Sequence, residues 1–301
     1  MELYQLRTFV TVAEEGHLTR AAGRLHISQP SVSAHVKALE EELGVTLFTR
    51  TPRGMEPTDH GRRLMDRARA VLDAADDMAR EASGLRDELA GALRLGVNTE
   101  SEFLRVVEAV SALAESHPRI EVDLVQTTSD RVPEMLRTGG LDASFICGNE
   151  VETDLEAVKI TDMPLAIAGP ASWSDRIRGA DIKGIAALPW IWMPHCCPFC
   201  LSALARFREQ GLEPTKILVT DDETAVKAMV RAGKGMGVLR LDEARELEAA
   251  GAAVAWDGPE LSVPLWLCIL KRRNGDPLLA ALAEAVRSVW PPATATKTAA
   301  A

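Results

Sequence analysis

The chain lacks the features that mark a membrane protein or a disulfide-stapled one. No stretch approaches the roughly 18 consecutive apolar residues of a membrane-spanning helix, and residues 1–10 mix charged with apolar side chains, unlike a secretory signal. Aromatic residues make up only 4% of the 301 residues, and there are five cysteines. An odd and small number of cysteines argues against a disulfide framework. We therefore expect a cytoplasmic protein without a membrane partner.

Positive charge is also scarce. The chain has 34 Lys and Arg against 44 Asp and Glu, a net charge of −10. Residues 1–70 are the exception, because their 10 basic and 9 acidic side chains leave a charge of +1. An acidic body repels polyanions, so any contact with nucleic acid has to be concentrated in this first segment. At this length, and with 47% hydrophobic residues, two or more globular domains are expected.

Three short helices are expected near the N-terminus, over residues 3–16, 19–26 and 28–44, because apolar residues recur there at helical spacing. Only His26 and Ile27 separate the second helix from the third, where Ser28 is placed as a cap. Two helices joined by so short a turn cross steeply, as in a helix-turn-helix. The sequence therefore predicts a DNA-binding element at this end.

A hairpin and a long helix are expected next. Residues 45–58 carry β-forming side chains on either side of a Pro–Arg–Gly turn, which predicts a hairpin or wing. Residues 58–89 are typical of one helix capped by Thr58, with apolar residues alternately four and three positions apart. Such a heptad seam predicts pairing of two chains; the alternative is an amphipathic helix on a domain surface. The seam residues are Leu64, Ala68, Val71, Ala75, Met78, Ala82, Leu85 and Leu89.

Beyond residue 91 the pattern changes to strands alternating with helices. Short loops between such elements predict parallel sheets with helices on both faces. Ligands of such sheets bind beyond the carboxyl ends of the strands, so residues 98–101, 127–129 and 147–148 are expected in a cleft. Residues 291–301 are expected to be a disordered tail.

The N-terminal segment, Phe9 to Leu64, resembles the winged helix-turn-helix of LysR-type transcriptional regulators. One departure is His17, which lies just before the second helix, where the family commonly has a serine; the phosphate contact implied at that position is therefore not implied for His17. The "LRTGG" and "VRAGKG" stretches are similar to landmarks of that family's effector domain. The family landmarks present here are Ala21, Ala22, Leu25, Ser28, Gln29, Pro30, Ser31, Ser33, Leu39, Glu40, Gly44, Leu47, Phe48, Arg50, Thr58 and Gly61.

The resemblance implies an α+β multidomain fold and an assembly. The C-terminal part would be an α/β effector domain of two Rossmann-like subdomains, similar to periplasmic binding proteins. A homodimer reading an inverted repeat in double-stranded DNA would assemble further into a homotetramer, and RNA polymerase is a further implied partner. The expected divisions are a winged helix-turn-helix at 1–58, a linker and dimerisation helix at 59–90, and an effector domain at 91–290, with subdomain I at about 91–162 plus 266–290 and subdomain II at about 163–265.

The DNA contacts are expected from the third helix and the wing. Helix-turn-helix proteins read the major groove with the first residues of the recognition helix, and a glutamine can pair bidentately with adenine. Gln29, Pro30 and Ser31 are therefore expected near base edges. Phosphate contacts, which fix register, suit hydroxyl and basic side chains. The expected DNA-binding set is Arg20, Gln29, Pro30, Ser31, Ser33, His35, Lys37, Arg50 and Arg53.

The expected effector cleft is rich in small polar side chains. Asn98, Thr99, Ser101, Thr127 and Thr128 offer donors suited to a carboxylate, although the same residues are also typical helix caps. Two nearby glutamates at 100 and 102 work against a strongly anionic ligand. A small organic effector is therefore one hypothesis for this cleft.

A cysteine-rich loop, "HCCPFC", is the second candidate. Pro198 suits the first helical position, which makes Cys197 the N-cap and predicts a lowered thiol pKa at the helix N-terminus. The "HC" pair resembles the reactive cysteine of peroxide-sensing LysR-type regulators, without the spacing to their second cysteine. The loop contributes His195, Cys196, Cys197 and Cys200 to the expected effector site, with Cys147 from the other subdomain.

Three interpretations of this loop stay open. Reversible thiol oxidation would make it a redox switch, and His195, Cys196, Cys197 and Cys200 could instead bind a soft metal ion. In the third, the thiols only line a pocket for an organic effector. A cysteine-dependent oxidoreductase is the rival from another class; a recognition helix and a heptad seam argue against it. We expect no enzyme and no certain cofactor, and we expect Cys268 in a core.

Overall fold

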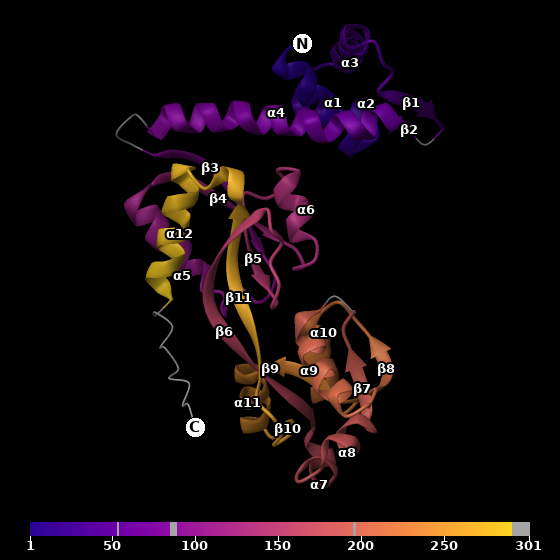
Figure 1. Cartoon of the computed structure of the whole chain (residues 1–301), viewed down its shortest axis with the longest axis vertical. Coiled ribbons are helices and arrows are strands. Elements are labelled where there is room, and N and C mark those ends of the chain that lie inside the picture. The colour runs from indigo at the N-terminus through magenta and orange to yellow at the C-terminus, as the bar shows by residue number, and fades with distance from the viewer. Residues whose placement is uncertain (53, 85–88, 195–196, 291–301) are drawn as a thin grey trace.

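The computed structural model describes residues 1–52, 54–84, 89–194 and 197–290. The N-terminal domain, which the sequence predicts to bind DNA, lies at one end of a long helix, and the predicted effector domain, of two lobes, lies below that helix (Figure 1). This arrangement confirms the fold class expected from the sequence. The expected tail at 291–301 falls outside the described residues.

The DNA-binding domain consists of three helices and a two-stranded wing. The most deeply buried side chains of its core, exposed by 1% or less, include Phe9, Val12, Val32, Leu39 and Leu47. The apolar positions recur every three or four residues, so each helix turns one face inward. The elements are α1 (Leu3–Glu15), α2 (Leu18–Leu25), α3 (Gln29–Leu43), β1 (Phe48–Thr51) and β2 (Gly54–Pro57), the two strands being antiparallel.

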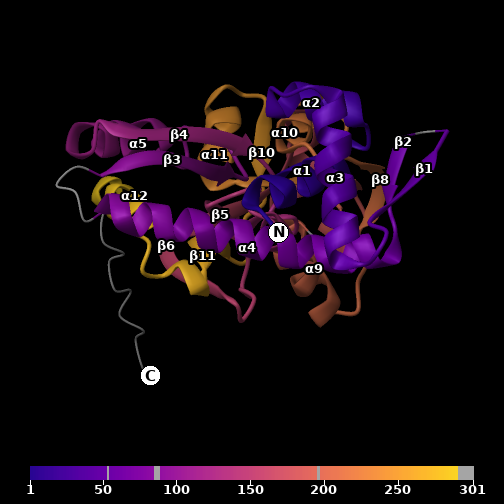
Figure 2. The same cartoon turned by 90° about the horizontal axis from the view of Figure 1, so that it is seen from above.

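The linker helix α4 (Asp59–Gly84) begins at the expected cap, because the backbone N–H of Gly61 donates to Thr58 Oγ1 over 3.0 Å. Leu89, the last residue of the helix expected from the sequence, lies outside it and directly precedes a strand. The expected end of the helix at Leu89 is therefore corrected, and residues 85–88 fall outside the described residues. In Figure 2 the helix runs beneath the DNA-binding domain towards the effector domain.

The first lobe of the effector domain holds most of a mixed sheet. The strands lie in the order β10 (Ala253–Ala255), β6 (Leu155–Pro170), β11 (Leu261–Leu270), β5 (Ala143–Cys147), β3 (Ala90–Val97) and β4 (Arg119–Gln126), with β9 (Gly237–Arg240) also paired to β6. β3 is parallel to β4 and β5, whereas β11 is antiparallel to β5 and β6. The expectation of wholly parallel sheets is therefore corrected. The elements here are β3 (Ala90–Val97), α5 (Val106–Ser116), β4 (Arg119–Gln126), α6 (Val132–Arg137), β5 (Ala143–Cys147) and α12 (Pro277–Val289).

Two long strands, β6 (Leu155–Pro170) and β11 (Leu261–Leu270), run from the first lobe into the second (Figure 1). The expected subdomain boundaries at 162/163 and 265/266 fall inside these strands, and the β11–β6 register shifts between Leu265 and Trp266. The second lobe contains α7 (Ser174–Ile177), α8 (Ile182–Ala186), β7 (Pro189–Trp192), α9 (Pro198–Glu209), β8 (Thr215–Val219), α10 (Glu223–Arg231), β9 (Gly237–Arg240), α11 (Leu241–Ala249) and β10 (Ala253–Ala255).

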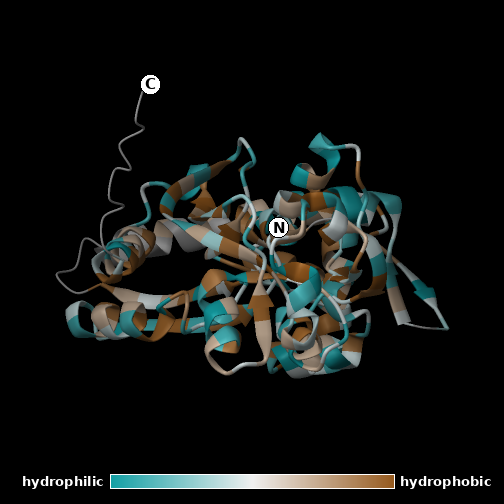
Figure 3. Cartoon of the chain, turned by 90° about the horizontal axis from the view of Figure 1, so that it is seen from below, coloured by the Kyte–Doolittle hydropathy of each residue, from teal (hydrophilic) through white to brown (hydrophobic). Residues whose placement is uncertain are grey.

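One continuous hydrophobic core extends through both lobes, from Leu93 and Phe145 in the first to Trp190 and Phe207 in the second. Figure 3 shows hydrophobic residues concentrated along the inner strands, with hydrophilic residues spread over the outer helices. Among the described residues, no helix combines the length and the apolar character needed to cross a bilayer.

Candidate DNA interface and effector cleft

Helix α3 presents a polar face to solvent at its first turns. Ser28 caps the helix by accepting a hydrogen bond from the backbone N–H of Ser31 over 3.2 Å. Val32, Val36 and Leu39 face inward, which leaves Gln29, Pro30 and Ser33 exposed on the opposite side. Ser31 is half-buried, and its hydroxyl lies 2.7 Å from that of Ser28. A helix so oriented can offer its N-terminal residues to a groove.

The wing is fixed against the turn between α1 and α2. The backbone N–H of Met55 donates to the Gly16 carbonyl over 2.7 Å. A Cβ on Gly54, whose φ is +130°, would lie 2.2 Å from that carbonyl oxygen and 2.7 Å from the His17 ring. His17 therefore packs against the wing and makes no side-chain cap at the start of α2. Sequence reasoning identified His17 as a departure without foreseeing this packing.

The basic side chains that are expected to contact DNA differ in their exposure and in the ion pairs and hydrogen bonds that they make within the protein. Arg50 is exposed on β1, and Lys37 is 78% exposed with a 3.6 Å ion pair to Glu41. Arg20 pairs with Glu15 at 3.6 Å. His35 Nδ1 lies 3.0 Å from Thr8 Oγ1. Arg53 falls outside the described residues.

Because Thr8 donates its hydroxyl proton to the Tyr4 carbonyl over 2.7 Å, the hydroxyl has to accept from His35 Nδ1, which assigns the proton to that nitrogen. The His35 ring also lies 4.7 Å from that of Tyr4. Only Nε2 of His35 is left to face a phosphate, and it can donate to one only when it also carries a proton.

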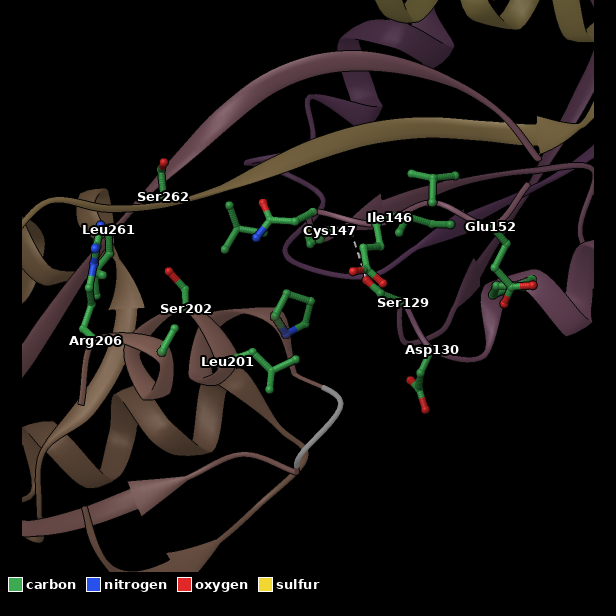
Figure 4. A pocket seen from close by; sticks show the side chains of 18 of the residues that line it. Ser129, Asp130, Ile146, Cys147, Glu152, Leu201, Ser202, Arg206, Leu261 and Ser262 are labelled. Atoms are coloured by element: carbon green, nitrogen blue, oxygen red, sulfur yellow. Dashed lines mark hydrogen bonds between the residues drawn. The ribbon is translucent and has the colours of Figure 1, made fainter. Parts of the chain in front are cut away.

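Two cavities lie between the lobes. The effector cavity, of about 620 Å³, is lined by seven residues that the sequence singled out: Asn98, Thr99, Ser101, Thr127, Thr128, Cys147 and Cys197. A second cavity, of about 890 Å³, shares Ser129, Asp130, Cys147 and Pro198 with it. Figure 4 shows this second cavity, with Leu201, Ser202 and Arg206 of α9 on one side and Ser129, Cys147 and Ile146 on the other.

The inner end of the effector cavity is a small hydrogen-bonded group on the first lobe. Asn98 Nδ2 donates to Ser129 Oγ over 2.9 Å and to Cys147 Sγ over 3.3 Å. The backbone N–H of Cys147 donates to Ser129 Oγ over 3.1 Å. Asn98 Oδ1 is buried without a partner among the described residues, so a ligand donor would satisfy it.

A second polar group joins the lobes at the rim. Thr99 Oγ1 donates to Glu223 Oε2 over 2.7 Å and accepts from Arg240 Nη1 over 3.1 Å. Arg240, only 2% exposed, also pairs with Glu100 at 2.6 Å and with Asp242 at 3.2 Å. Burial raises the pKa of Glu223 to about 7, against the hydrogen bond from Thr99.

The sequence did not single out Glu223 or Arg240, because both are ordinary charged residues at element ends. The one sequence signal that could have identified Arg240 is an arginine as the last residue of a buried strand. Carboxylates also dominate the described lining of the effector cavity, with Glu100, Asp130, Asp221, Asp222 and Glu223 against Arg131. A strongly anionic effector is therefore disfavoured.

The cysteine loop is only partly as expected. Cys197 is the N-cap of α9 and Pro198 its first residue. The Cys200 thiol hydrogen-bonds to Cys197 and lowers the pKa of Cys197, helped by the N–H groups of Cys200 and Phe199. The same bond, with burial, raises the pKa of Cys200. His195 and Cys196 lie outside the described residues.

Cys200 does not line the cavity, which corrects the expectation for this residue. Its side chain is 3% exposed and packs in the core of the second lobe, where Sγ accepts from the Met193 N–H over 3.4 Å. Cys268 is fully buried, as expected. Among the described side chains, no group of three or more His, Cys, Asp and Glu is placed to hold a metal ion.

The comparisons with known proteins agree with this architecture. Residues 3–62 match the family described as "Bacterial regulatory helix-turn-helix protein, lysR family". Residues 86–291 match "LysR substrate binding domain". The regulator AbaB of Streptomyces antibioticus is 33% identical over 294 residues, which covers 95% of this chain and 96% of AbaB.

Two further relatives bear on the site. A probable hydrogen peroxide-inducible genes activator of Mycobacterium xenopi is 36% identical over 165 residues, 55% of this chain and 87% of that protein. The crystal structure of full-length CbnR complexed with its target DNA has a TM-score of 0.65 at 26% identity, covering 96% of this chain and 99% of CbnR. The chain thus belongs to the LysR family of DNA-binding transcriptional regulators, which are not enzymes.

Proposed function

We propose that this regulator acts in the cytoplasm, binds an inverted-repeat operator through α3 and the wing, and changes that binding when an effector occupies the cavity between the lobes. The observation that carries the DNA half is the exposed face of α3, where Gln29 and Ser33 stand clear of the domain core. CbnR, a structural neighbour, is complexed with its target DNA. Within this proposal Gln29 reads base edges, while Ser33, His35 Nε2, Lys37 and Arg50 contact phosphates.

The linker helix supports a homodimer. Leu64 and Ala68 of the expected seam pack against the DNA-binding core, whereas Val71 is 42% exposed and Met78 is 71% exposed. Apolar side chains in register on a solvent-facing helix favour pairing with a second copy of the chain. Two recognition helices would then face two half-sites.

Assembly into a tetramer and contact with RNA polymerase are part of the same proposal. The edge strands β4 and β8 carry exposed apolar side chains, Leu124 on the first and Ile217 and Val219 on the second, exposed by 49%, 53% and 60%. Unpaired edge strands with apolar side chains favour association with another chain. A copy of this chain is the occupant we propose.

For the effector, two candidates follow from the cavity. A small organic molecule could use the hydroxyl and amide groups around Asn98, provided that it is not strongly anionic, because carboxylates dominate the lining. The alternative is thiol chemistry at Cys197, favoured by its lowered pKa and by the likeness to a hydrogen peroxide-inducible genes activator. Either event would shift the population of lobe angles and so the packing of the recognition helices.

Selection of the purified full chain against a pool of random duplex DNA tests the DNA half. Enrichment of an inverted repeat is expected. Gln29→Ala should relax sequence preference at one base pair of each half-site, whereas Arg50→Ala should weaken binding to all sequences alike and lower the salt slope by about one. Arg178→Ala, an exposed arginine of the distant lobe, is the matched control. Recovery of no preferred sequence by the unmodified protein would contradict the proposal.

A further inference from the structure

Two cysteines reach the effector cavity from opposite lobes. Cys147 is the last residue of β5 in the first lobe, and Cys197 caps α9 in the second. Both line the same cavity. The residues that follow them face each other across the cleft, since a Cβ built on Gly148 would be in van der Waals contact with Pro198 Cγ, at 3.9 Å. Burial raises the pKa of Cys147, and an ionised Cys197 would raise it further.

The residues around Cys147 and Cys197 limit the class of ligand that this pair can bind. A closed zinc site needs four ligands, and no group of three or more His, Cys, Asp and Glu is placed for a metal in the part of the chain that the structure describes. Cys200 is 3% exposed and does not line the cavity. A ligand that needs only two sulfur atoms, one from each lobe, fits this arrangement better than a metal ion that needs a complete set of protein ligands.

We propose that Cys147 and Cys197 form a cross-cleft dithiol whose ligand is a soft, thiol-seeking centre with two exchangeable groups, of the trivalent arsenical type R–As(OH)₂. This proposal rests on the function proposed above, because the ligand would act as the regulator's effector. Soft thiolate ligands select such centres over hard cations. The carboxylate-rich cavity also favours a neutral or cationic molecule over an anion.

The two thiols differ in solvent exposure, and this difference determines which of them reacts first. Cys197 is partly exposed at a helix N-terminus, whereas Cys147 is 5% exposed and accepts a hydrogen bond from Asn98. Cys197 Sγ attacks first: an As–S bond forms, an As–OH bond breaks, and hydroxide leaves with the thiol proton as water. Cys147 then replaces the second hydroxyl in the same way, releasing a second water. Neither arsenic nor sulfur changes its oxidation state.

The second As–S bond links the two lobes through the arsenic atom. The first bond holds the arsenic beside Cys147, so the second step is intramolecular and gains from a high effective concentration. Two bonds to one centre should therefore bind about 100-fold more tightly than one. A fixed distance between β5 and α9 would hold the lobes at one angle, which is the change that the recognition helices report.

Phenylarsine oxide, which hydrates to R–As(OH)₂, is the probe. The full chain is reduced with a phosphine, titrated with the probe, and analysed by intact mass and by displacement with thiols. One adduct per chain is expected, removable by dithiothreitol and resistant to excess 2-mercaptoethanol. Cys147→Ser should weaken binding about 100-fold and make the adduct removable by 2-mercaptoethanol. Cys197→Ser should slow or abolish the reaction.

Cys268→Ala, a buried cysteine outside the cavity, and Cys196→Ser are the controls, and neither should change the adduct. Thermal unfolding of every variant checks folding, and Cys147→Ala serves if the serine is not tolerated. Undiminished, monothiol-resistant binding by a folded Cys147 variant, or its loss in Cys196→Ser alone, would overturn the proposal. Operator binding by the same preparations separates the two proposals: a protein that selects DNA but lacks the cross-cleft adduct refutes only this one.

Discussion

Glu223 makes the stability of the effector domain depend on pH in a predictable direction. Its carboxylate is largely buried at the start of α10, and it accepts the Thr99 hydroxyl across the cleft. Burial raises the pKa of Glu223 to about 7. The charged groups around it are Arg240, Glu243 and Glu100, of which only the arginine favours ionisation. Glu223→Gln keeps an acceptor for Thr99 and removes the titration.

The direction and the size of the pH dependence follow from the linkage between proton binding and folding. A carboxyl whose folded pKa lies above its unfolded value binds more protons in the folded state, so stability is highest below the unfolded pKa, ordinarily 4.5, and is lost as pH rises towards 7 and beyond. A difference of about 2.5 in pKa, at about 1.4 kcal/mol for each tenfold change in proton affinity, corresponds to about 3 kcal/mol. Glu223→Gln should therefore match the unmodified protein near pH 4.5 and exceed its stability by up to about 3 kcal/mol at pH 8.

Urea unfolding followed by tryptophan fluorescence reports this difference, because Trp190 and Trp192 are buried in the core of the second lobe. The measurement is made at several pH values from 4.5 to 8 on both proteins. Glu102→Gln, an exposed carboxyl near the cleft, is the control and should leave the pH profile unchanged. Parallel profiles for the unmodified protein and Glu223→Gln would refute the assigned role of burial at this carboxyl.

Further outcomes follow from the linker helix and its junction. Gly61→Ala should cost about 1–3 kcal/mol in unfolding experiments, because the new Cβ would lie 2.2 Å from the Leu47 carbonyl oxygen; an unchanged melting temperature would contradict this close approach. Thr58→Ala should cost about 1 kcal/mol through the lost cap, measured in the same way. Val71→Glu combined with Met78→Glu should turn a dimer into monomers in sedimentation experiments, and a persistent dimer would show that this helix face is not the interface.

Local patterns in the sequence were enough to predict the DNA-binding end. The cap at Ser28, the glycine after α3 and the apolar spacing of α3 are all read within a few residues, and local hydrogen bonds fix them. The cavity residues at 98–101 and 127–128 were predictable because strand ends meet at one edge of a sheet.

Long-range geometry was not predictable in the same way. The antiparallel pairing of β11 with β5 and β6 depends on where the chain returns after the second lobe, and no local signal carries that. Cys200 was assigned to the cavity by its nearness to Cys197 in sequence, but it lies one turn inside α9, where its side chain is covered by the core of the lobe. Arg240 escaped notice because its partner Thr99 lies 141 residues away.

The two strands shared by the lobes constrain how an effector can act. β6 and β11 form an antiparallel ribbon that passes through the junction, where Pro164 lies opposite Ser262 and Pro264 opposite Asp162, next to the register shift. Proline has no N–H to give to the ladder, so the ribbon is softest there. Rotation of one lobe against the other has to be absorbed as torsion of this ribbon. Torsion would need no broken backbone hydrogen bond, so under the proposed mechanism the domain would regain its resting angle when the effector leaves.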